Sequence, residues 1–161
     1  MLKSHETYID IALGQAEAAG AVSEVPIGAA LIDAGGEVIS AAGNQVITRA
    51  DPTAHAEIIC LRDAARQIGN YRLLNTTLYV TVEPCIMCMG AVIHARIATV
   101  VFGAFDPKWG GAGSLYDFAA DDRLNHHPHI ISGVREDRCR TLLQDFFRAR
   151  RNSVATNNDI T

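Results

Sequence analysis

The sequence has 161 residues, of which 48% are hydrophobic, and its formal net charge is −4 at pH 7. This length fits one domain, which we expect over residues 1–151, followed by a polar tail over 152–161 that frays. No apolar run is long enough to span a bilayer, so no membrane partner is expected, and the acidic balance excludes binding to nucleic acid through total charge alone.

Hydrophobic periodicity predicts strands that alternate with helices along the chain. Helices are expected over 4–19, 53–68, 85–95 and 136–150. Strands are expected over 26–33, 37–43, 78–82, 99–103 and 129–134. Ser4 is the expected cap of the first helix. Such alternation indicates an α/β fold with helices on both faces of a sheet, and the segment 78–103 predicts a right-handed parallel crossover.

The cysteine content indicates a metal site in preference to disulfides. The four cysteines are Cys60, Cys85, Cys88 and Cys139. The N-terminus soon becomes polar and acidic, unlike a signal peptide, and a C-x-x-C pair accompanies a histidine motif. We therefore expect a reducing, cytoplasmic location.

Two short motifs together supply the ligands of a catalytic zinc site: His55-Ala56-Glu57 and Pro84-Cys85-Ile86-Met87-Cys88. One imidazole and two thiolates suit zinc, and three protein ligands leave a tetrahedral ion with an open fourth position, which is typical of catalysis. Zinc lowers the pKa of a bound water to about 7, and Glu57 beside the ligand histidine is the expected proton carrier. The pattern is characteristic of zinc deaminases.

A structural zinc site and a redox dithiol are the alternatives. A structural site needs a fourth protein ligand, but Cys60 lies about 140° around a helix from His55. Cys60 and Cys139 are therefore expected to be small buried hydrophobes. A dithiol would leave His55 and Glu57 without a role. A second histidine cluster is interpreted as a polar loop and strand entry in preference to another metal site: His126, His127 and His129.

Longer segments around these motifs resemble the tRNA-specific adenosine deaminases of the cytidine-deaminase-like superfamily. They cover residues 51–58, 70–73, 77–85, 90–91, 94–97, 100–104 and 113–115. The zinc motifs alone would indicate only the superfamily, whereas the intervening segments favour the tRNA enzymes. The likeness extends over almost the whole chain.

This resemblance implies a three-layer α/β/α sandwich built on a five-stranded mixed sheet. It implies a homodimer that hydrolyses adenosine to inosine at the wobble position of a tRNA anticodon stem-loop. By the same resemblance, His55, Cys85 and Cys88 hold one Zn²⁺ per subunit, and Glu57 is the catalytic proton shuttle.

The resemblance also implies substrate contacts. Asn44 is expected to contact the purine, and Asp106 and Lys108 border the nucleotide channel. The basic end of the last helix resembles the part that meets the anticodon loop, with Phe146, Phe147, Arg148 and Arg150. Phe147 and Arg150 are the candidate RNA contacts, although which of the two phenylalanines packs and which stacks on a base stays open.

The loop over 105–109 is more apolar than the family pattern, and Trp109 is either a stacking platform or a hydrophobic plug. Two other functions remain as alternatives. A deaminase of a free base or nucleoside, such as guanine or cytosine, fits the zinc motif equally well. A silent scaffold that uses zinc for folding is disfavoured by the intact Glu57 and by the missing fourth ligand.

Overall fold

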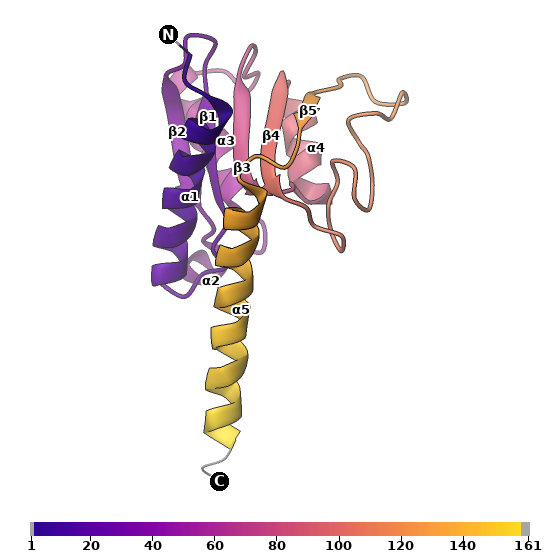
Figure 1. The fold of residues 1–161 in the computed structure, drawn as a ribbon. Helices are drawn as coiled ribbons and strands as arrows, with labels where there is room; N and C mark the ends of the chain where they lie inside the picture. The colour runs from indigo at the N-terminus through magenta and orange to yellow at the C-terminus, as the bar shows by residue number, and fades with distance from the viewer. Residues whose placement is uncertain (1, 159–161) are drawn as a thin grey trace.

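The computed structural model describes residues 2–158, and its elements follow the predicted order (Figure 1). The helices are α1 (His5–Ala21), α2 (Val46–Arg49), α3 (Ala56–Ile68), α4 (Ile86–Ala95) and α5 (Glu136–Asn158). The strands are β1 (Gly28–Ile32), β2 (Val38–Gly43), β3 (Thr77–Val82), β4 (Thr99–Ala104) and β5 (His129–Ile131). Among the described residues, no helix combines the length and apolarity needed to cross a membrane.

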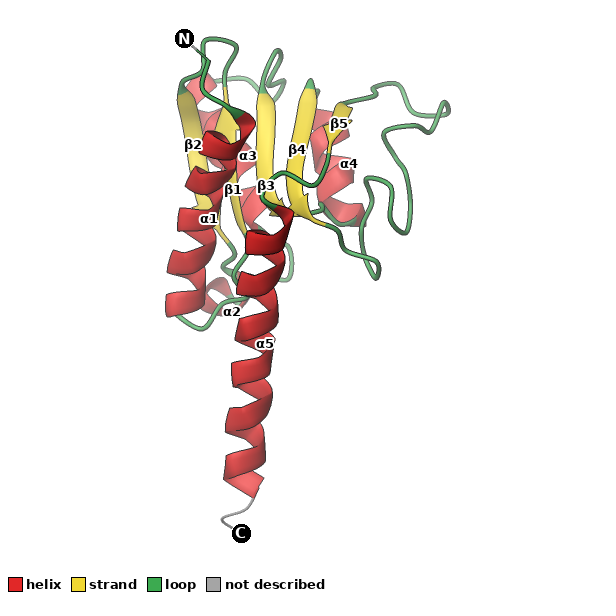
Figure 2. Cartoon of the chain, viewed as in Figure 1, coloured by secondary structure: helices red, strands yellow, loops and turns green. Residues whose placement is uncertain are grey.

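The five strands form one mixed sheet in the order β2-β1-β3-β4-β5. β1 runs antiparallel to both β2 and β3, whereas β3, β4 and β5 run parallel. The segment β3-α4-β4 is therefore the parallel crossover that the sequence predicts. Figure 2 shows α1 and α5 on one face of the sheet, with α3 and α4 on the other, which confirms the α/β/α sandwich.

Alternating side chains of the central strands build two cores, one on each face of the sheet. In β1, Ala29 and Leu31 belong to the core under α3 and α4, whereas Ala30 and Ile32 belong to the core under α1. In a strand with one face in water, apolar and polar residues alternate. Here helices cover both faces of the sheet, so the residues on both sides of the strand are apolar. The strand therefore appears in the sequence as a continuous apolar run.

Capping at α1 follows the prediction. The side chain of Ser4 accepts a hydrogen bond from the backbone N–H of Thr7, at 3.3 Å. This contact satisfies one of the amides that the first helical turn leaves without a partner.

The last helix extends further than predicted. The sequence predicts a helix over 136–150 and a frayed tail from 152, whereas α5 continues to Asn158 and projects past the rest of the molecule (Figure 1). The side chains of residues 151–154 are exposed, so no apolar periodicity marks this part of the helix in the sequence. Residues 159–161 of the predicted tail lie outside the described part.

One further boundary and one short helix differ from the prediction for local reasons. β5 ends at Ile131 rather than at 134, because Gly133, with a φ of 79°, turns the chain toward α5. α2 spans four residues, which is too short for a period of 3.6 to be visible.

The start of α5 lies unusually close to β4. A Cβ atom added to Gly103 would lie 2.4 Å from Sγ of Cys139 and 2.8 Å from the carbonyl oxygen of Thr81. Cys139 is buried there, as predicted for a small hydrophobe. Only glycine at position 103 allows the helix to approach this closely.

Candidate metal centre and catalytic cavity

Two helix beginnings bring the predicted zinc ligands together. His55 precedes α3 and Cys85 precedes α4, each as the N-cap residue with an extended backbone, and Cys88 lies in the first turn of α4. The sequence predicted both residues inside helices that begin at 53 and 85, and the structure moves each boundary toward the C-terminus. The positive ends of both helix dipoles therefore face the site, which favours anionic sulfur.

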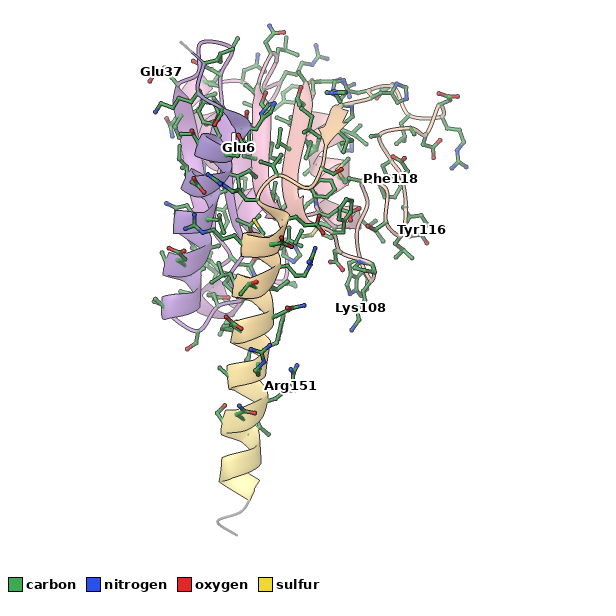
Figure 3. The ribbon with its side chains drawn as sticks, in the orientation of Figure 1. Glu6, Glu37, Lys108, Tyr116, Phe118 and Arg151 are labelled. Carbon is green, nitrogen blue, oxygen red and sulfur yellow. The ribbon has the colours of Figure 1, made fainter. Side chains whose placement is uncertain are left out.

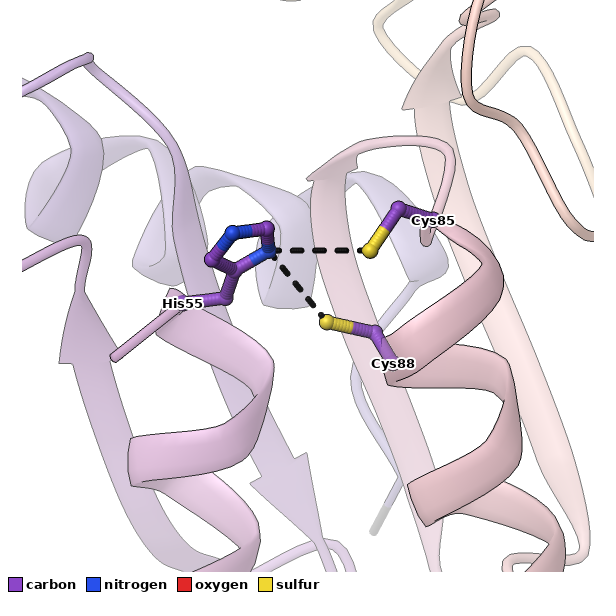
Figure 4. A group of neighbouring side chains, drawn as sticks. All are labelled: His55, Cys85 and Cys88. Carbon is purple, nitrogen blue, oxygen red and sulfur yellow. Dashed lines mark hydrogen bonds between the residues drawn. The ribbon is translucent and has the colours of Figure 1, made fainter. Parts of the chain in front are cut away.

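The distances among the three ligand atoms suit zinc. Nδ1 of His55 lies 3.6 Å from Sγ of Cys85 and 3.6 Å from Sγ of Cys88 (Figure 4). Tetrahedral bonds of about 2.0–2.1 Å to nitrogen and 2.3 Å to sulfur place such atoms about 3.6 Å apart. The three ligand atoms all lie within 4.8 Å of one another, so they can occupy three of the four positions around one tetrahedral ion.

The two thiols have opposite electrostatic surroundings. Hydrogen bonding from Cys88, and then from His55, lowers the pKa of Cys85 to about 4. The neighbouring Cys85 sulfur and burial raise the pKa of Cys88. The protein alone therefore favours one thiolate, and a divalent cation supplies the charge that makes both sulfurs anionic.

The other cysteines and histidines stay apart from this centre. Among the described residues, His55, Cys85 and Cys88 form the sole group of three or more metal-ligating side chains. The buried Cys60 lies beside Ser40, which donates a hydrogen bond to the Cys60 carbonyl at 2.8 Å. Burial raises the pKa of the Cys60 thiol to about 12. No fourth protein ligand closes the site in the described part of the chain.

Glu57 points to catalysis because one of its carboxylate oxygens has no partner. The residue lies in the first turn of α3 and is 4% exposed. Its Oε2 is buried without a hydrogen-bond partner among the described residues. Burial raises the pKa of this carboxyl to about 7. A buried carboxylate that is poised near neutral pH and free to bond is suited to carrying a proton.

A cavity of about 580 Å³ opens beside the ligand set. It is lined by Ile27, Pro52, His55, Glu57, Val82, Glu83, Cys85, Ile86, Met87, Asp106 and Trp109. This volume lies in the range of small-ligand sites, and a mostly apolar wall with few polar groups is their usual character. The cavity can take one nucleobase beside the zinc ligands.

Glu83 organises the loop that forms one wall of this cavity, a role that is not predicted from the sequence. The residue is 2% exposed and follows β3 directly. Its carboxylate accepts hydrogen bonds from the backbone amides of Asp106, Ala112 and Ser114 at 3.0–3.1 Å, and one from the Ser114 hydroxyl. An acidic residue between a buried strand and Pro84 was the available sequence signal.

Replacing Glu83 with glutamine is expected to destabilise the protein by about 2–3 kcal/mol, because the amide group turns a donor toward backbone donors that are buried. Urea unfolding of the zinc-loaded protein measures this change. Asp117→Asn is the matched control, since the exposed Asp117 accepts one amide hydrogen bond, from Ala120. Equal stability of both variants would contradict the role of Glu83 as the anchor of the loop.

Two predicted substrate residues lie near the cavity. Asn44 is buried after β2, and its Oδ1 lacks a partner among the described residues. It does not line the cavity but a separate pocket beside α1, and it adjoins the cavity only through its backbone amide, which donates to the carbonyl of the lining residue Ile27, at 3.0 Å. Asp106 lines the cavity directly, but its Oδ1 accepts the backbone amides of Lys108 and Trp109. Asp106 therefore shapes the loop, and both substrate contacts stay predictions.

Two other predicted substrate residues, Lys108 and Phe147, line a neighbouring basic groove of about 590 Å³, whereas Arg150 lines a separate hollow with Phe147, Arg151 and Val154. We define the basic groove by its lining residues Lys108, Leu143, Gln144, Phe147, Arg148 and Arg151. Figure 3 shows Lys108 on the loop after β4, on the side where Arg151 projects from α5. Arg150 lies over the ring of the half-buried Phe146, whereas Phe147 is 39% exposed. The structure thus favours Phe147 as the exposed aromatic residue.

Comparison with known proteins agrees with this centre. Residues 2–104 match the family model described as the cytidine and deoxycytidylate deaminase zinc-binding region. The tRNA-specific adenosine deaminase of Haemophilus influenzae is 49% identical over 91% of this chain and 84% of its own length.

Solved structures agree as well. A structure from work on A-to-I editing by tRNA:A34 deaminases superimposes with a TM-score of 0.82 at 41% identity, over 85% of this chain and 99% of that one. Guanine deaminase from Bacillus subtilis gives a TM-score of 0.62 at 34% identity, over 73% of this chain and 74% of that one. From the zinc-ligand geometry and these matches, the chain belongs to the cytidine and deoxycytidylate deaminase zinc-binding family and, within it, to the tRNA-specific adenosine deaminases, which are zinc-dependent hydrolases.

Proposed function

We propose that this protein hydrolyses adenosine to inosine and ammonia at the wobble position of a tRNA anticodon. The observation that carries this proposal is the unpartnered carboxylate oxygen of Glu57, which lies in one cavity with His55 and Cys85. The names of the chain's relatives supply the substrate class, and the basic groove beside the cavity supplies a surface for RNA.

His55, Cys85 and Cys88 would hold the zinc ion, since their geometry fits tetrahedral coordination. When bound, zinc supplies a nucleophile at neutral pH by lowering the pKa of water to about 7. Glu57 takes the proton of the attacking water and delivers it to N1 of adenine as the C6–O bond forms. Glu57 then takes the remaining proton from the hydroxyl group on C6 and delivers it to the exocyclic nitrogen, so that the C6=O bond forms, the C6–N bond breaks and ammonia leaves.

The base must leave the RNA stack to enter this cavity. Bases in anticodon loops can be splayed out at low cost, and a pocket that reads the base edge then selects among them. The unpartnered Oδ1 of Asn44 supports its proposed contact with the purine, and the location of Asp106 in the cavity wall supports its proposed place beside the nucleotide channel. Phe147 and Arg150 would meet the anticodon loop from α5.

Lys108→Ala is expected to raise KM for RNA with a small change in kcat, because Lys108 lines the basic groove and not the cavity. If Lys108 contacts one phosphate, the slope of log binding constant against log salt should fall in magnitude by about 1. Binding measured from 50 to 200 mM salt tests this, with the exposed Lys3→Ala as the control. An unchanged slope would argue against a phosphate contact.

We also propose that the chain functions as a homodimer in the cytoplasm, with residues 1–151 as one deaminase domain. An apolar surface beside α3 supports the dimer, since Ile68, Tyr71 and Leu74 are each 47–66% exposed. A second copy would remove this surface from water. Light scattering is expected to give twice the chain mass for the native protein and the chain mass for Leu74→Glu; equal masses would argue against this interface.

Deamination of an anticodon stem-loop with adenosine at the wobble position tests the proposed substrate. Free guanine, cytosine and adenosine are assayed beside it with the same zinc-loaded protein. Inosine at that one position, with no product from the small molecules, supports the tRNA assignment. Turnover of guanine with unmodified RNA would instead assign the activity of the guanine deaminase to which this chain is also similar.

A further inference from the structure

Trp109 presents a large aromatic ring to solvent at the edge of the catalytic cavity. It lines the cavity with His55 and Glu57, yet it is 63% exposed. We infer that its indole stacks on the base next to the target adenosine and forms a second base-binding position outside the zinc site. This inference rests on the RNA substrate proposed above and adds a residue that determines how the flanking nucleotide is held.

The backbone around Trp109 is fixed although its ring is exposed. The amide of Trp109 donates to Oδ1 of Asp106 at 3.2 Å, and the Gly110 amide donates to the Asp106 carbonyl at 2.9 Å. The Asp106 amide in turn donates to the buried Glu83 carboxylate at 3.0 Å. A ring on an anchored backbone loses little conformational freedom when a base stacks on it, so stacking contributes most of its free energy to binding.

Trp109 also lies where an RNA strand would pass. Its neighbour Lys108 lines the basic groove with Phe147 and Arg151, whereas Trp109 lines the catalytic cavity. Consecutive residues of one loop therefore border two different cavities. A strand whose phosphates follow the basic groove crosses Trp109 before its target base enters the cavity, and aromatic rings bind bases of any sequence by stacking.

The contacts of the neighbouring aromatic residues distinguish a stacking platform from a hydrophobic plug. Phe105 lies edge-on against the buried Phe102, with 5.3 Å between the ring centroids. Tyr116 stacks on Phe118, with 5.6 Å between the ring centroids. Among the described residues, no ring contact involves Trp109. A plug would pack its ring against the wall, so the exposed ring of Trp109 fits a partner that arrives with the substrate.

The activity test pairs Trp109→Ala with stem-loops that lack the base on the 5′ or the 3′ side of the target. On intact RNA the variant is expected to lose about tenfold in kcat/KM, the usual effect of one stacked base, and Trp109→Phe should retain most activity. Removal of the base at one of the two flanking positions should lower kcat/KM of the native protein by the same factor. The same removal should leave kcat/KM of the Trp109→Ala variant unchanged. Tyr116→Ala, whose side chain lines neither cavity, is the control.

Fluorescence provides a readout that does not depend on turnover, because Trp109 is the sole tryptophan in the sequence. In a Glu57→Gln background, intact stem-loop should quench its emission, and the stem-loop without the partner base should not. Equal quenching by both RNAs, or independent losses in the activity test, would overturn the stacking inference. Quenching by RNA that the native protein does not deaminate would overturn the proposed function and leave the stacking contact.

Discussion

Glu57→Gln is expected to retain zinc and lose at least about 10²–10⁴-fold in turnover, the usual contribution of a general acid–base group. Glutamine has nearly the same shape but cannot accept and release the two protons that the reaction transfers. The buried and unpartnered Oε2 of Glu57 is the atom that would carry it. Single-turnover formation of inosine in a wobble-adenosine stem-loop measures the loss.

Glu37→Gln is the matched control for this variant, since Glu37 is exposed at the end of the molecule opposite the free end of α5 (Figure 3). It should match the native protein in rate. Zinc content and thermal unfolding of both variants separate a chemical defect from a folding defect. A Glu57→Gln protein that keeps close to the native rate would remove Glu57 from the proton path.

Cys85→Ala is expected to reduce zinc content from about one ion per chain to nearly none and to abolish activity. The ion links the beginnings of α3 and α4, so its loss also affects stability. An ion present at a thousand times its dissociation constant stabilises the folded state by about 4 kcal/mol. For a domain of this size, that corresponds to a fall of roughly 10 °C in Tm.

Cys60→Ala is the control, because Cys60 is buried beside Ser40 and lies outside the ligand group. It should lose some stability through lost packing but keep one zinc ion per chain. Zinc is measured after dialysis against a weak chelator, beside calorimetry with and without added zinc. If Cys85→Ala binds zinc like the native protein, or if added zinc restores its Tm, the proposed ligand set is wrong.

The metal centre could be anticipated from the sequence because its determinants are local. Cys85 and Cys88 are one helical turn apart, and His55 is two residues from Glu57, so each motif brings its own groups together. The buried strand before Pro84 indicates that the second motif lies at the carboxyl end of that strand. Only the meeting of the two helix beginnings required tertiary structure, and the alternation of strands and helices indicated it.

The loop beside the cavity could not be anticipated in the same way. Glu83 receives amides from residues 106, 112 and 114, all more than twenty positions away in the chain. Period and motif describe neighbours in sequence, whereas these bonds depend on how an irregular loop folds back. Lys108 and Trp109 are a second example, because they are neighbours in one loop of the sequence. In the structure Lys108 lines the basic groove, whereas Trp109 lines the catalytic cavity.

Because Cys139 packs closely against Gly103, a small change in packing there would tilt α5 and displace its far end. At 1.5 Å per residue, Arg150 lies about 16 Å along the helix axis from Cys139, so a tilt of about 5° at the packed end moves Arg150 by about 1.4 Å. A methyl group added at Gly103 would push against Cys139, at the packed end of α5, and would contact neither RNA nor zinc. Under the proposed contact of Arg150 with the anticodon loop, a change at Gly103, a residue inside the sheet, would therefore shift a residue that meets the substrate.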